Sequence, residues 1–89
     1  MELSISIQIW KKDKSYIAKC PELDFVSQGT DRDEARRNLL EAMEIQLEEM
    51  GELGTLDEYL SECGYVHQNC VLTPHTEMVV FKKQSIQVA

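Results

Sequence analysis

The sequence contains few cysteines and no long apolar run, and each of these shortages argues against a class of protein. Three cysteines, Cys20, Cys63 and Cys70, stand in 89 residues. An odd and sparse set argues against a disulfide framework and favours free thiols in a reducing compartment. No apolar run approaches the roughly 20 residues that span a bilayer, and the first residues alternate instead of forming a signal peptide. We therefore expect a single cytoplasmic domain over residues 1–89, without a membrane span.

Positive charge is scarce in the middle of the chain. The net charge is −7. Between Glu22 and Glu62, thirteen acids against three arginines sum to −10, whereas six lysines against three acids in the remainder sum to +3. Such a segment repels a phosphate backbone and attracts a basic partner. Alternatively, it is a solvated helix surface that keeps the protein in solution.

The first third of the chain predicts three strands. Residues 3–11 alternate with period two and place Leu3, Ile5, Ile7 and Ile9 on one face. A polar turn at residues 12–14 is too short for a crossover, so residues 15–20 should form an antiparallel second strand. Pro21 cannot donate to a strand ladder and should end it. Residues 25–28 read as a third strand, which Gly29 ends.

The next third predicts two helices. Thr30 and Asp33 form a capping box, and the helix should run to about Met50 and stop at Gly51. Its apolar stripe comprises Ala35, Leu39, Ala42, Met43, Leu47 and Met50. Ile45 points towards the polar side, where either the next segment covers it or it belongs to a contact surface; we favour the cover. A second capping box at Thr55 should open a short helix that ends at Gly64.

The last third is predicted to end in a strand. Residues 65–77 suggest a short strand to Leu72 and then a loop through Pro74, and residues 78–88 suggest a final strand. The whole is an α+β, two-layer β-β-β-α-β domain with a short second helix before the last strand. That strand must join its own sheet or pair with another subunit, so we expect a homodimer or higher homo-oligomer.

Several segments in order resemble the HicB-like (UPF0150-type) antitoxin family. They are Tyr16-Ile17-Ala18-Lys19-Cys20-Pro21-Glu22-Leu23, Ser27-Gln28-Gly29-Thr30, Glu34-Ala35 and Leu39-Leu40-Glu41-Ala42-Met43-Glu44. The resemblance covers residues 1–50 and implies a partial ribonuclease-H-like fold. It also implies an antitoxin-type binding module that neutralises a small basic mRNA-cleaving HicA-type toxin by protein–protein contact. The alternative is a solitary HicB-like regulatory protein.

The resemblance and the charge together suggest where a partner binds. The expected partner-binding residues are Glu34, Glu41, Glu44 and Glu48 on the acidic helix, with Trp10 as an exposed aromatic anchor. Many members of the family carry a C-terminal helix-turn-helix or ribbon-helix-helix that binds DNA. Here the sequence closes on a lysine-containing strand, so direct DNA binding is not expected.

Neither catalysis nor a cofactor is expected. Two-metal nuclease chemistry needs clustered carboxylates, and residues 3–11 contain none. We therefore expect no enzyme activity, no catalytic residue and no cofactor. Cys63, His67, Cys70 and His75 have the spacing C-x3-H-x2-C-x4-H and could give a tetrahedral zinc site, which the alternative regulatory function would use. Small cysteines packed in the core beside surface histidines are the favoured interpretation.

Overall fold

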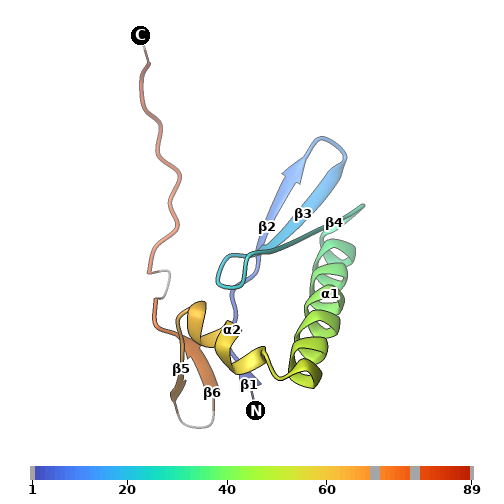
Figure 1. Cartoon of the computed structure of the whole chain (residues 1–89). Helices are drawn as coiled ribbons and strands as arrows, with labels where there is room; N and C mark the ends of the chain where they lie inside the picture. The colour runs from blue at the N-terminus through green and yellow to red at the C-terminus, as the bar shows by residue number, and fades with distance from the viewer. Residues whose placement is uncertain (1, 69–70, 77–78, 89) are drawn as a thin grey trace.

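The protein is an α+β domain with two helices and two small sheets (Figure 1). The structure, a computed structural model, describes residues 2–68, 71–76 and 79–88. The elements are β1 (Glu2–Leu3), β2 (Gln8–Lys12), β3 (Ser15–Cys20), β4 (Phe25–Gly29), α1 (Arg32–Leu53), α2 (Leu56–Glu62), β5 (Tyr65–Gln68) and β6 (Val71–Pro74). Neither helix in these ranges combines the length and apolar content that crossing a membrane requires.

The expected three-stranded meander is confirmed, since β2, β3 and β4 form an antiparallel sheet in that order. The first strand, however, is not continuous over residues 3–11. Its start, β1, pairs in parallel with β6, and its end, β2, pairs with β3. Between them the Ser6 backbone N–H donates to the Glu22 carboxylate instead of to a strand (3.0 Å). The strand breaks where it changes neighbours, because no single strand flanks its whole length.

The prediction for the end of the chain is wrong in two places. The strands β5 and β6 pair in antiparallel orientation and make the second sheet with β1, in the order β1-β6-β5. Residues 79–88, which we call the C-terminal segment, form no strand in this structure and extend away from the body of the domain (Figure 1). A strand needs a neighbour for its backbone hydrogen bonds, and this segment has joined neither sheet of its own chain. Met78 lies outside the described residues.

Both predicted ends of the long helix are displaced. Asp31, not Thr30, is the N-cap: its backbone is extended and its carboxylate accepts the Glu34 N–H (2.8 Å). The helix passes through Gly51 and ends at Gly54, which adopts the left-handed conformation (φ 77°). The Thr55 N–H closes this end by donating to the Met50 carbonyl (2.9 Å). The Thr55 hydroxyl also donates to the Met50 carbonyl (3.5 Å) and makes no cap for α2, so the second predicted capping box is wrong.

The core lies where the two helices meet both sheets. Its buried residues are Ala18, Cys20, Leu23, Ala35, Leu39, Met43, Leu60, Tyr65 and Leu72. Ala42, expected in the apolar stripe, is exposed. The approach of β4 to the start of α1 is so close that a Cβ on Gly29 would lie 2.5 Å from the Ala35 nitrogen. The helix α1 thus covers the face of the meander on which Ala18 is buried. Because side chains alternate along a strand, the neighbours of Ala18 in β3, Ile17 and Lys19, point to the opposite face, which we call the uncovered face of the meander.

Candidate interaction surface

The second half of α1 presents an acidic helix face, which consists of Glu41, Glu44, Glu48, Glu49 and Glu52. All five side chains are exposed. Within the described ranges none of them makes a hydrogen bond or an ion pair. The three arginines of α1 lie in its first two turns, and its last turn contains no basic residue. Three of the predicted partner-binding residues are thus brought together on one unneutralised surface.

This acidic helix face lowers the stability of the helix that carries it. Glu52 lies in the last turn of α1, where the helix dipole disfavours negative charge by about 0.3–1 kcal/mol. Glu44 and Glu48, and Glu48 and Glu52, are also like-charge pairs four residues apart, each destabilising by about 0.2–0.5 kcal/mol. Folding alone does not favour this arrangement. A basic partner would relieve it.

Ile45 lies among these carboxylates and is exposed, so our expectation that the next segment covers it is wrong. Its side chain is 59% exposed. Its neighbours on the helix surface are Glu41, four residues before it, and Glu48 and Glu49, three and four residues after it. An apolar side chain ringed by charged groups has the composition of an interface centre and its polar rim. The helix α2 packs elsewhere because its apolar residues contact the core beside Leu60.

The acidic surface continues beyond α1 in a way that the sequence analysis missed. A hollow of about 300 Å³ lies between the end of α1 and α2, and its lining includes Met50, Tyr59, Glu58 and Glu62. Glu58 and Glu62 are four residues apart and therefore share one side of α2. That spacing is visible in the sequence, but only the packing of α2 against α1 brings these carboxylates to the end of the acidic helix face.

Glu34 and Trp10 do not lie on the acidic helix face. Glu34 is half-buried in the first turn of α1, and its carboxylate accepts hydrogen bonds from the backbone N–H and the hydroxyl of Thr30 (3.1 and 3.3 Å). Trp10 is 47% exposed and pairs with Ile17, which places it on the uncovered face of the meander. Its ring meets Phe81 of the C-terminal segment in an edge-to-face contact (centroids 5.9 Å apart). The predicted partner-binding residues therefore lie in three places: the acidic helix face, the first turn of α1 and the uncovered face of the meander.

Partly or fully buried side chains at and near the corner after β3 make hydrogen bonds that hold together the elements supporting these surfaces. The Cys20 thiol donates to the Glu22 carboxylate (3.4 Å), and burial raises the pKa of this thiol to about 11. The Tyr59 hydroxyl donates to the Leu23 carbonyl (2.8 Å), and burial raises its pKa to about 12. The Tyr65 hydroxyl donates to the Ser4 carbonyl (2.9 Å), and burial raises its pKa too. Cys20 is protonated at neutral pH and is therefore a structural thiol, not a nucleophile.

The cysteine and histidine set after α2 is described only in part. Cys63 is half-buried and packs against the core, and His75 is exposed, with its backbone N–H bonded to the Gly64 carbonyl. Cys70 and the side chain of His67 lie outside the described residues. Among the side chains that are described, no three of histidine, cysteine, aspartate and glutamate gather as a metal site would require.

Comparisons with protein-family models, with curated proteins and with solved structures gave no match to this chain.

Proposed function

We propose that this chain is an antitoxin-type binding module of the HicB-like kind, which neutralises a small basic HicA-type toxin through protein–protein contact. The observation that carries the proposal is the exposed and unpaired acidic helix face with Ile45 at its centre. The residues that resemble the HicB-like family supply a second argument, since they build the meander and the helix that present this face. The partial ribonuclease-H-like fold and the binding, non-catalytic role are parts of the same proposal.

Binding would combine long-range attraction with a short-range apolar contact. The field of Glu41, Glu44 and Glu48 would steer a basic protein towards α1 and raise its association rate, an effect that salt screens. Ile45 would then lose its exposure to solvent beneath the partner, with the carboxylates at the rim. Glu58 and Glu62 would extend the contact onto α2, beside the hollow at the end of α1.

The test is binding to a HicA-type protein encoded beside this chain, produced in a catalytically inactive form. We expect Glu44→Gln with Glu48→Gln to weaken the complex about fivefold to thirtyfold at low salt, in line with about 0.5–1 kcal/mol for each charge. Ile45→Ala should weaken it further, with little dependence on salt, because it removes apolar contact only. Reversal of Glu41, Glu44 and Glu48 to lysine should abolish binding at the concentrations where the original chain binds.

The control changes the net charge equally on the other layer of the domain. Ser15→Lys with Gln28→Lys alters exposed residues of the meander and brings the net charge from −7 to −5, as the glutamine pair does. This variant should bind as the original chain does, apart from a small general charge effect. If both pairs weaken the complex equally, the overall charge matters and not the acidic helix face. If the lysine reversal leaves the complex intact at moderate salt, the proposed mode of binding is wrong.

A further inference from the structure

The C-terminal segment has the composition of a strand but lacks a strand's neighbours. Within its ten described residues, five apolar side chains are 63–83% exposed: Val79, Val80, Phe81, Ile86 and Val88. Four of the five are β-branched, which favours extended backbone in a sheet. A short domain does not gain stability from holding such a segment in solvent, because the apolar surface stays in contact with water. The segment is therefore suited to a sheet that this chain alone does not complete.

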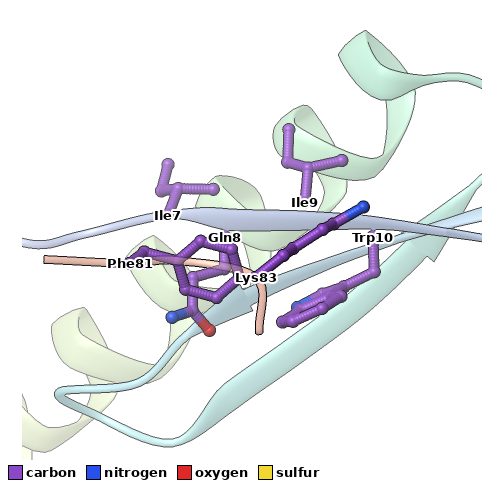
Figure 2. A pocket seen from close by; sticks show the side chains of 6 residues that line it. All are labelled: Ile7, Gln8, Ile9, Trp10, Phe81 and Lys83. Atoms are coloured by element: carbon purple, nitrogen blue, oxygen red, sulfur yellow. The ribbon is translucent and has the colours of Figure 1, made fainter. Parts of the chain in front are cut away.

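An open sheet edge lies beside it. In the meander β3 is central, so among the described residues β2 has one side without a ladder partner. Between this edge and the C-terminal segment is an open groove of about 440 Å³ (Figure 2). Ile7, Ile9 and Trp10 line it from the side of β2, and Phe81 and Lys83 line it from the other side. Among the described residues, the one aromatic pair across the groove is that of Trp10 with Phe81.

We propose that the occupant of this groove is the C-terminal segment of a second copy of the chain, in a dimer that exchanges these segments. Each segment would add to the free edge of the partner's β2 and supply the missing ladder of backbone hydrogen bonds. In Figure 1 the segment runs in the same direction as β2. A two-fold axis between the two segments and perpendicular to them then makes each segment antiparallel to the partner's β2 and to the other segment.

The side chains favour a second copy over the chain's own segment. In the same chain, Phe81 reaches Trp10 only through its side chain, and the five apolar residues remain exposed. An antiparallel register that sets Phe81 of one copy opposite Trp10 of the other also sets Val80 and Val79 opposite Lys11 and Lys12. In this register no lysine lies directly opposite another lysine. The Trp10 ring of one copy lies beside the Phe81 ring of the other. This inference does not depend on the proposed toxin partner, because β2 and the acidic helix face lie on different surfaces.

The experiment follows the mass of the chain and the fluorescence of Trp10, its single tryptophan, over a dilution series. We expect twice the chain mass at high concentration. On dilution, the emission of Trp10 should shift to the red with the same midpoint as the loss of dimer mass, since the ring becomes more exposed. A chain truncated after Met78 should be monomeric, with red-shifted emission at every concentration. This truncation removes no residue of the buried core, so the domain should fold.

Two matched substitutions to aspartate separate the groove from the uncovered face of the meander. Phe81→Asp changes a residue of the C-terminal segment that is 63% exposed, and Val26→Asp changes one on β4 that is 59% exposed. We expect Phe81→Asp to raise the dimer dissociation constant roughly tenfold or more, because it would set a charge against the Trp10 ring in the interface, and Val26→Asp to leave it unchanged. Dissociation by Val26→Asp alone would show a face-to-face dimer and overturn the proposal. A monomer at all concentrations, or Trp10 emission independent of concentration, would also overturn it.

Discussion

Glu22 at the corner after β3 is a carboxylate whose charge stabilises the fold, and its neutralisation tests the account of this corner. Its side chain accepts the Ser6 N–H (3.0 Å) and the Cys20 thiol (3.4 Å). Burial alone would raise the pKa of Glu22, but the hydrogen bonds, led by that of Ser6, outweigh burial and lower it below 4.5. The folded state therefore favours the charged form of this group.

The size and the pH dependence of the effect follow from these contacts. A hydrogen bond to a charged group contributes about 1.5–3 kcal/mol to the free energy of unfolding, more than one to a neutral group. Glu22→Gln keeps an acceptor oxygen but loses the charge, so we expect a loss of about 1 kcal/mol at pH 7. Because the folded pKa is depressed, this stabilisation is complete above pH 4.5 and disappears as the pH falls through the folded pKa. Below that value the original chain and the variant should be equally stable.

Urea unfolding followed by circular dichroism at neutral pH and at several acidic values measures this difference. Glu49→Gln is the control, because Glu49 is exposed and belongs to the unpaired acidic helix face. Its effect should stay within about 0.5 kcal/mol and should not weaken the protein. A Glu22→Gln variant as stable as the original at pH 7 would refute the argument. A difference that persists unchanged through the acidic range would do the same, since it would not come from the charge.

Two further predictions concern the helix contacts and the buried thiol. Gly29→Ala should lower the free energy of unfolding by about 1–3 kcal/mol, because its Cβ would overlap Ala35. Gly51→Ala should instead raise it by about 0.5–1 kcal/mol, because Gly51 lies within α1 with space for a methyl group. Urea unfolding measures both, and a loss of stability in Gly51→Ala would contradict the helix end at Gly54. Cys20 should resist alkylation by iodoacetamide in the folded protein and react once urea unfolds it, because it is buried with a pKa of about 11. Peptide mass mapping checks this prediction. Modification of Cys20 before Cys63 in the native state would count against it.

The sequence by itself determined the features that depend on near neighbours along the chain. Alternation and a polar turn set the pairing of β2 with β3, and Pro21 ended β3 at Cys20. The spacing of Ala35, Leu39 and Met43 identified the face of α1 that is buried. The acidic helix face could also be predicted, because charge and a period of 3.6 residues are properties of the sequence alone.

The tertiary structure decided whatever depended on distant partners. Asp31 and Thr30 are both good caps, and Gly51 and Gly54 are both good helix ends, so the packing of β4 and α2 against α1 selected between them. The alternation over residues 3–11 does not show that their first part pairs with β6 and their last part with β3, which is why the predicted strand is divided into β1 and β2. Nor does the sequence pattern of α1 show that Ile45 is left uncovered. The C-terminal segment is the clearest case, since its sequence favours a strand, but a strand forms only where another backbone is in place to receive its hydrogen bonds.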